Sequence, residues 1–128
     1  MNNILVIEDN ADILEAIEVV LSLSKYSVQT LSGGEKVWEQ ISKIRPDLII
    51  LDVMMPKPDG YQLCKELKSN PITKQIPVML LSAKSQKSDI EQGYLAGADV
   101  YMTKPFQNED LRKAVSGLLE KHYVPQTR

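Results

Sequence analysis

Residues 48–60 read LIILDVMMPKPDG, and the fold follows most directly from this stretch. It opens with four consecutive apolar residues, which an acid, Asp52, follows at once. A short unbroken apolar run is typical of a strand buried on both faces, as in a parallel sheet. The turn-forming residues that follow, among them Pro56, Pro58 and Gly60, end the strand and lead into a helix. We therefore expect a central strand with a carboxylate at its carboxyl end.

The same alternation of apolar run and amphipathic segment occurs five times along the chain. Strands are expected at residues 4–7, 27–31, 48–51, 78–81 and 100–102, and helices at 11–22, 34–44, 60–69, 86–96 and 108–121. Five strand–helix units imply parallel strands joined by right-handed crossovers, with helices on both faces. We predict a doubly wound five-stranded parallel α/β sheet in which the second, more polar strand lies near an edge.

The composition is that of one ordinary globular domain. The chain has 128 residues, of which 43% are hydrophobic and 25% charged, and a formal net charge of −2. We assign residues 1–121 to the domain and 122–128 to a tail or the start of a linker. The net charge argues against direct nucleic-acid binding by this domain, and no apolar run approaches the roughly 18 residues that cross a bilayer. With a single cysteine, Cys64, and no signal peptide, a cytoplasmic protein is expected.

Polar side chains follow four of the five expected strands. Glu8 and Asp9 follow the first, Asp52 the third, Ser82 the fourth, and Lys104 comes shortly after the fifth. Because the carboxyl ends of parallel strands meet at one edge of the sheet, these side chains should converge on one pocket. One acidic pair in a loop is usually just solvated, but acids after two strands and a lysine after a third favour a site. Three clustered carboxylates call for a cation, and we predict Mg²⁺, with Mn²⁺ as a plausible alternative.

Four motifs together resemble the receiver domain of two-component response regulators, of the chemotaxis-regulator type. They are Glu8-Asp9, the stretch LDVMMP at 51–56 with Asp59-Gly60, the stretch LSA at 81–83, and Gly97-Ala98-Asp99 with Lys104-Pro105-Phe106. The resemblance covers residues 4–119 and implies a flavodoxin-like sheet with strand order 2-1-3-4-5. It also implies a signalling domain that accepts a phosphoryl group, not a turnover enzyme.

The resemblance implies a metal and phosphoacceptor site. Asp52 would accept the phosphoryl group, and Asp9 and Asp52 would bind the metal directly. Glu8 would act through a water molecule, and the backbone carbonyl of Met54 would complete the protein ligands. Many family members have aspartate where Glu8 stands, so we interpret this glutamate as a tolerated variant that alters metal affinity.

The resemblance also implies a switch. Lys104 would pair with Asp52 and then with a phosphoryl oxygen, and Ser82 and Ala83 would bind the phosphate. Tyr101 would turn inward when Ser82 moves. The donor would be a phosphohistidine on a sensor histidine kinase or phosphotransfer protein.

Three further hypotheses concern the surroundings of this site. Met54 and Lys84, each two residues beyond a site residue, are expected to help set the lifetime of the phosphoryl group. A possible output surface for a downstream protein, or for a phosphorylation-dependent homodimer, is formed by Ile90, Tyr94 and Tyr101. One charged dimer lattice found in relatives with winged-helix outputs is disfavoured, because its acidic and arginine positions are Val100 and Ala114 here.

Other classes of function fit less well. A phosphatase of the haloacid-dehalogenase type would need a second acid where Met54 stands. A flavodoxin-like cofactor binder would need a phosphate-cradling glycine cluster after the first strand, where Glu8-Asp9-Asn10 stands instead. A receiver that no longer takes phosphate is not favoured, because all the site residues are present. A free-standing receiver and the N-terminal receiver of a larger regulator, for example one with a DNA-binding output, remain equal alternatives.

Overall fold

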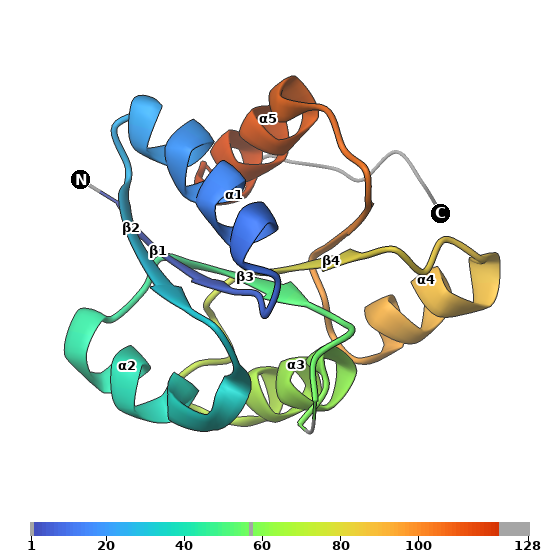
Figure 1. Ribbon diagram of the computed structural model, residues 1–128. Coiled ribbons are helices and arrows are strands. Elements are labelled where there is room, and N and C mark those ends of the chain that lie inside the picture. The colour runs from blue at the N-terminus through green and yellow to red at the C-terminus, as the bar shows by residue number, and fades with distance from the viewer. Residues whose placement is uncertain (1, 57, 121–128) are drawn as a thin grey trace.

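The computed structural model describes residues 2–56 and 58–120, which form a three-layer α/β structure (Figure 1). Its parallel sheet has the order β2-β1-β3-β4-β5. The described strands are β1 (Asn3–Ile7), β2 (Ser27–Leu31), β3 (Leu48–Asp52), β4 (Val78–Ser82) and β5 (Val100–Thr103). The predicted fold class and strand order are therefore confirmed.

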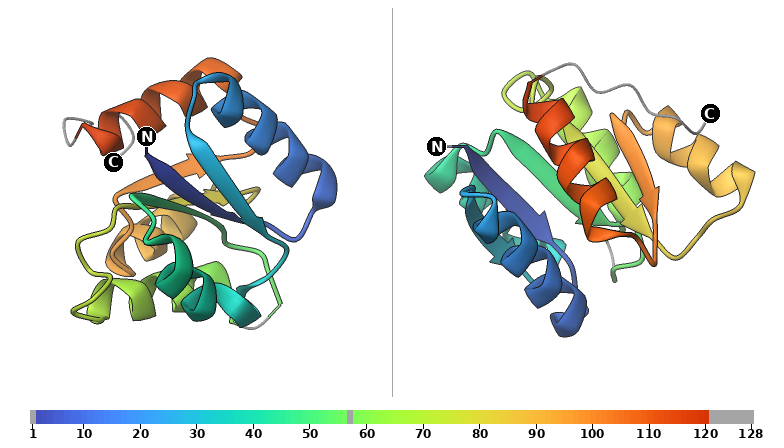
Figure 2. Two further views of the ribbon diagram at one scale, coloured as in Figure 1. Left: turned by 90° about the vertical axis from the view of Figure 1, so that its left-hand side faces the viewer. Right: turned by 90° about the horizontal axis from the view of Figure 1, so that it is seen from above.

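Helices cover both faces of this sheet. They are α1 (Ala11–Leu23), α2 (Val37–Ile44), α3 (Gly60–Ser69), α4 (Lys87–Leu95) and α5 (Asn108–Leu119). Figure 1 shows α1 and α5 on one face and α2 and α3 on the other, and Figure 2 shows α1 and α5 lying side by side. The buried side chains form two apolar clusters, one under α1 and α5 and one under α2, α3 and α4.

The central position of β3 follows from its sequence. All five of its residues are buried. Leu48 and Ile50 join the cluster under α1 and α5, whereas Ile49 and Leu51 join the opposite cluster, as the alternation of side chains along a strand requires. Every residue of β2 is half-buried or exposed, which fits its place at the edge. Both positions agree with the prediction from the sequence.

Side-chain caps define where two of the helices begin. The carboxylate of Asp59 accepts a hydrogen bond from the backbone N–H of Gln62 at 2.9 Å and so starts α3. Asn10 caps α1 in the same way through the N–H of Ile13. No side chain caps the segment after Gly33, and its first turn, Gly34–Lys36, is a 3₁₀ helix. The prediction of one α-helix over 34–44 was wrong for that turn, because uncapped N–H groups are satisfied by tighter bonds.

The remaining differences lie at helix ends. The helix expected at 86–96 is α4, with Gln86 and Ala96 as its cap residues. The last helix was expected to reach residue 121, which is outside the described residues, and α5 ends at Leu119. The proposed tail at 122–128 also lies outside them. No helix in the described part of the chain is long and apolar enough to cross a membrane.

Candidate phosphoacceptor and metal site

The carboxyl ends of the strands bring three acids together, as the sequence predicted. A carboxylate oxygen from each of Glu8, Asp9 and Asp52 lies within 4.8 Å of the others. Glu8 and Asp9 follow β1 directly, and Asp52 is the last residue of the adjacent strand β3. Glu8 and Asp52 are buried, with 1% and 3% of their surface exposed, whereas Asp9 is exposed. The cluster is thus open to solvent on the side of Asp9.

Lys104 reaches the same cluster from the segment after β5. Its Nζ donates to Oε1 of Glu8 at 2.7 Å and lies 3.3 Å from Oδ1 of Asp52. The predicted pairing with Asp52 is present, but the shorter contact is with Glu8. The backbone N–H of Lys104 donates to the carbonyl of Ser82 at 2.8 Å, and its peptide bond to Pro105 is cis. The ammonium is therefore a shared partner of two buried carboxylates.

Backbone groups fix the orientation of both buried acids. The N–H of Met54 donates to Oδ1 of Asp52 at 3.1 Å, and the N–H of Asn10 donates to Oε2 of Glu8 at 3.1 Å. The backbone of Met54 therefore lies beside the Asp52 carboxylate, where its carbonyl is predicted to bind a metal. The Met54 side chain is 54% exposed at the rim of the site.

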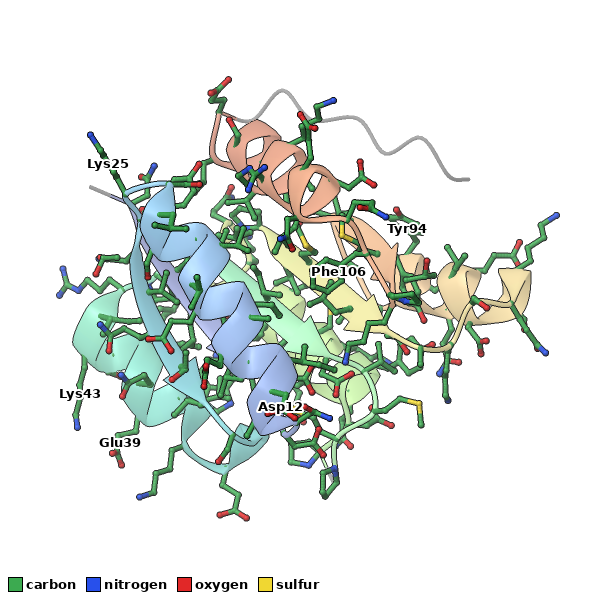
Figure 3. All side chains as sticks on the ribbon, turned by 45° about the horizontal axis from the view of Figure 1, so that its top comes forward. Asp12, Lys25, Glu39, Lys43, Tyr94 and Phe106 are labelled. Carbon is green, nitrogen blue, oxygen red and sulfur yellow. The ribbon has the colours of Figure 1, made fainter. Side chains whose placement is uncertain are left out.

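The charge balance of the cluster favours cation binding. Burial, followed by a hydrogen bond with Asp52, raises the pKa of Glu8 to about 7, although Lys104 and the N–H of Asn10 act in the opposite direction. One lysine does not fully compensate three carboxylates. Figure 3 places Asp12, an exposed acid in the first turn of α1, close to the same end of the sheet. The donor set consists of oxygens only, which suits a hard divalent cation such as Mg²⁺ or Mn²⁺.

The predicted switch residues lie next to this cluster. Ser82 ends β4 and is completely buried, and its Oγ accepts a hydrogen bond from the N–H of Lys84 at 3.0 Å. Ala83, between them, is exposed in the loop before α4. Tyr101 is only 5% exposed, and its hydroxyl donates to the carbonyl of Lys84 at 2.9 Å. The tyrosine ring therefore already occupies an inward position in this structure.

The predicted output residues do not form one exposed apolar patch. Tyr101 is buried, and Ile90 and Tyr94 are half-buried and pack against the same core cluster. Tyr94 reaches from α4 toward β5, where its hydroxyl accepts from the N–H of Tyr101 at 3.2 Å (Figure 3). The exposed apolar side chain of α4 is Leu95, at 87%. The expectation of a surface made by all three residues thus needs correction for Tyr101, because its ring is enclosed by α3 and α4.

Two contributors to the site were not predicted from the sequence. Gly60 packs so closely on the backbone of Asp52 that an added Cβ would lie 2.4 Å from the Asp52 carbonyl oxygen. Tyr61, next in the chain, lines the pocket that opens beside the acids, together with Asp9, Met54 and Lys84. The Asp59-Gly60 pair indicated a turn and the start of a helix, but it did not indicate that Gly60 packs against the Asp52 backbone.

Comparison with known proteins agrees with this geometry. Residues 4–116 match the family model of the response regulator receiver domain. The chain is 39% identical over 127 residues to the DNA-binding dual master transcriptional regulator RpaA of Synechocystis sp., covering 98% of this chain and 53% of RpaA. It is 38% identical over 121 residues to the alkaline phosphatase synthesis transcriptional regulatory protein PhoP of Bacillus subtilis, covering 94% of this chain and 50% of PhoP.

Solved structures show the same likeness. A signal receiver domain of a signal transduction histidine kinase from Syntrophus aciditrophicus superposes with a TM-score of 0.88 at 36% identity, covering 94% of this chain and 92% of that one. The BeF3-activated N-terminal receiver domain of RstA from Klebsiella pneumoniae superposes with a TM-score of 0.86 at 27% identity, covering 92% of this chain and 98% of that one.

A doubly wound sheet with three acids and a lysine at its carboxyl edge defines the class of phospho-receiver folds. The chain belongs to the response regulator receiver domain family of two-component signalling. It is a signalling domain rather than a turnover enzyme, and such domains interact with histidine kinases and with downstream output domains. The chain spans about half the length of the curated relatives it matches.

Proposed function

We propose that Asp52 accepts a phosphoryl group from a phosphohistidine on a sensor histidine kinase or phosphotransfer protein. The convergence of Glu8, Asp9, Asp52 and Lys104 on one edge of the sheet carries this proposal. A carboxylate oxygen of Asp52 attacks the phosphorus, the P–N bond breaks, and its electron pair returns to the imidazole nitrogen. The product is an acyl phosphate on Asp52.

The residues around Asp52 have defined tasks in this step. Asp9 and Asp52, with the carbonyl of Met54 and with Glu8 through water, would hold Mg²⁺ or Mn²⁺, which would neutralise charge on the phosphoryl oxygens. Lys104 is close enough to Asp52 to follow an oxygen of the transferred group. The N–H of Met54 orients one carboxylate oxygen of Asp52, and the other oxygen would attack the phosphorus.

The output step is proposed to run through Ser82 and Tyr101. The Ser82 oxygen accepts from Lys84, so its own hydrogen is available to donate to a phosphoryl oxygen, with Ala83 alongside. Movement of Ser82 and of the loop after it would alter the Lys84 carbonyl that holds Tyr101. Half-buried Ile90 and Tyr94 would then transmit the change to a downstream protein or a second copy of the chain.

Phosphorylation can be tested directly by intact mass. The protein is incubated with acetyl phosphate and Mg²⁺, and we expect wild type, but not Asp52→Asn, to gain one phosphoryl group. Asp47→Asn is the matched control, because Asp47 lies just before the opposite end of the same strand, where its carboxylate accepts from the N–H of Asn3. Equal labelling of wild type and Asp52→Asn would refute the assignment of the acceptor.

Met54 and Lys84 are proposed to help set the lifetime of the phosphoryl group. Both line the pocket beside the acids, and Met54 is largely exposed there. Exchanging both residues should change the rate at which the phosphoryl mass decays after acetyl phosphate is removed. An unchanged decay rate would rule out this role.

The chain is proposed to act as the receiver of a longer regulator or as a free-standing receiver. The curated relatives, two of which are named as transcriptional regulators, are about twice as long as the matched part, which supports the first form. The charged dimer lattice stays disfavoured, because Val100 and Ala114 are both buried. Pulldown with the unphosphorylated and phosphorylated protein, and its size by light scattering in both states, would distinguish a protein partner from a homodimer.

A further inference from the structure

The start of α3 is fixed to the backbone of the phosphoacceptor. The N–H of Gly60 donates to the carbonyl of Val53 at 3.0 Å. An added Cβ on Gly60 would lie 2.4 Å from the carbonyl oxygen of Asp52 and 2.6 Å from Cα of Val53, so the two segments are in direct backbone contact. Tyr61 follows immediately and is 7% exposed. Its position relative to Asp52 is therefore set by close packing rather than by flexible side chains.

Tyr61 in turn contacts the segment that follows Ser82. Its hydroxyl donates to the carbonyl of Asp89 at 3.0 Å, and Nζ of Lys84 lies over its ring, 5.7 Å from the centroid. An ammonium at this distance from an aromatic face is attracted by the ring quadrupole. Tyr61 thus contacts the loop before α4 through the Lys84 ammonium, and the first turn of α4 through the Asp89 carbonyl.

A second tyrosine acts on the same loop. Tyr101 donates its hydroxyl hydrogen to the carbonyl of Lys84 at 2.9 Å. Each phenol carries one hydrogen, and these two hydrogens are directed to the carbonyls of Asp89 and Lys84, so the 3.5 Å separation of the Tyr61 and Tyr101 oxygens adds little. The backbone of Lys84 is therefore held by Tyr101 while its ammonium is held by the Tyr61 ring.

Both Tyr61 and Lys84 line a pocket whose wall includes Val53, the residue that follows Asp52. Met54, 54% exposed, lines the same pocket, together with the exposed acid Asp9. In this pocket Tyr61 is buried, whereas Lys84 is exposed. Lys84 is therefore an exposed residue of a pocket that is also lined by the segment following Asp52.

We propose that Tyr61 is a positioning residue that holds the Lys84 ammonium across this pocket and thereby slows hydrolysis of the acyl phosphate on Asp52. The inference rests on the proposed phosphorylation of Asp52. In the step concerned, a water oxygen attacks phosphorus, the bond from phosphorus to the Asp52 oxygen breaks, and Asp52 regains its carboxylate. Inorganic phosphate leaves and the surplus proton goes to solvent. A Lys84 side chain that the Tyr61 ring does not hold would leave the approach of water to the phosphorus open more of the time.

The experiment compares the decay of phosphorylated protein, by intact mass, in wild type, Tyr61→Phe, Tyr61→Leu, Lys84→Ala and the double variant Tyr61→Leu/Lys84→Ala. Loss of the ring should accelerate decay roughly two- to fivefold, the range expected for an exposed cation–π contact. Tyr61→Phe keeps the ring face and should decay like wild type. The double variant should decay no faster than Lys84→Ala. Tyr26→Leu, which removes a half-buried ring from the other apolar cluster, is the control and should leave decay unchanged.

A spectroscopic measurement on the unphosphorylated protein gives an independent test. Protons of the Lys84 ε-methylene should show an upfield ring-current shift in wild type and in Tyr61→Phe, and lose it in Tyr61→Leu. A random-coil shift in wild type would overturn the proposal, even where Tyr61→Leu fails to fold. Unchanged or slower decay in folded Tyr61→Leu, or additive acceleration in the double variant, would also overturn it. Absence of phosphoryl mass on wild type would instead refute the proposed function, and the chemical shift would still report where Lys84 lies.

Discussion

Nζ of Lys104 lies 2.7 Å from Oε1 of Glu8, although these residues are 96 positions apart in the chain. Glu8 is 1% exposed, and the same ammonium also contacts buried Asp52. Removing one partner of a buried ion pair leaves an uncompensated charge. We therefore expect Lys104→Met to lower the free energy of unfolding by about 2–4 kcal/mol in EDTA, measured by urea denaturation. Saturating Mg²⁺ should reduce the loss, because the cation substitutes for the ammonium.

The exposed pair on α2 provides the control for that prediction. Lys43 lies 3.6 Å from Glu39, and both side chains are more than 60% exposed (Figure 3). Exposed pairs contribute little, so Lys43→Met should change stability by less than about 0.5 kcal/mol with or without Mg²⁺. An equal loss for Lys104→Met in EDTA and in Mg²⁺ would show that the lysine does not compensate the acidic cluster.

Gly60 is expected to tolerate no side chain. A Cβ at this position would meet the Asp52 carbonyl oxygen at 2.4 Å, and backbone atoms cannot move aside as a flexible side chain can. Gly60→Ala should therefore destabilise the protein by about 1–3 kcal/mol or more and slow phosphorylation, because Asp52 must shift. Urea denaturation and the rate of phosphoryl mass gain measure the two effects.

Gly33→Ala is the matched control for Gly60→Ala. Nothing lies within 4 Å of a Cβ at Gly33, and its φ of −170° is accessible to any residue. We expect its stability and phosphorylation rate to equal those of wild type. Comparable losses in both variants would mean that the close approach to Asp52 is not the cause.

The part of the site that depends only on which residues follow the strands could be predicted from the sequence. Acids after two strands and Lys104 after a third had to meet if the strands were parallel, and they do. The unbroken apolar run of β3 also gave its central place, because only a strand covered on both faces can be apolar throughout. These inferences need the order of elements and their periodicity, but no side-chain conformation.

The contacts that were missed depend on the path of loops. Neither the preference of Lys104 for Glu8 nor the contact between Lys84 and the Tyr61 ring has a signal in residue spacing, because each joins two loop segments or helix starts. The Asp59-Gly60 pair predicted a helix start correctly, but a turn glycine and a glycine in close backbone contact look alike in sequence. The exposure of Tyr101 was misjudged for a similar reason, since its enclosure depends on Gly93.

Gly93 makes room for the inward ring of Tyr101. A Cβ at this position of α4 would lie 2.5 Å from Cδ2 of Tyr101 and 3.2 Å from Cδ1 of Leu80. Alanine normally stabilises a helix interior by roughly 0.5–1 kcal/mol relative to glycine. Here we expect Gly93→Ala to give no such gain, and to move the Tyr101 ring outward. The ring resonances in ¹³C-tyrosine NMR, with Gly33→Ala as the control, would show this, and an unshifted Tyr101 would contradict it.

Cys64 is expected to act as a pH-sensitive reporter of folding rather than as a reactive thiol. It is completely buried, and burial raises its pKa to about 12 from an ordinary value near 9. In the unfolded chain the thiol ionises above about pH 9, whereas in the folded protein it stays protonated. The contribution of Cys64 to the free energy of unfolding is therefore full below pH 9 and is lost as the pH rises toward 12. The stability advantage of wild type over Cys64→Ala should therefore shrink by about 1–2 kcal/mol between about pH 8 and pH 10.5. Urea denaturation at the two pH values measures this change. Subtracting the stability of Cys64→Ala from that of wild type cancels the parallel effect of Tyr61, whose pKa is also raised by burial.

A difference between the two variants that stays constant with pH would mean that the thiol ionises as easily in the folded protein as in the unfolded chain. Rapid reaction of native Cys64 with a thiol reagent at about pH 8 would point the same way.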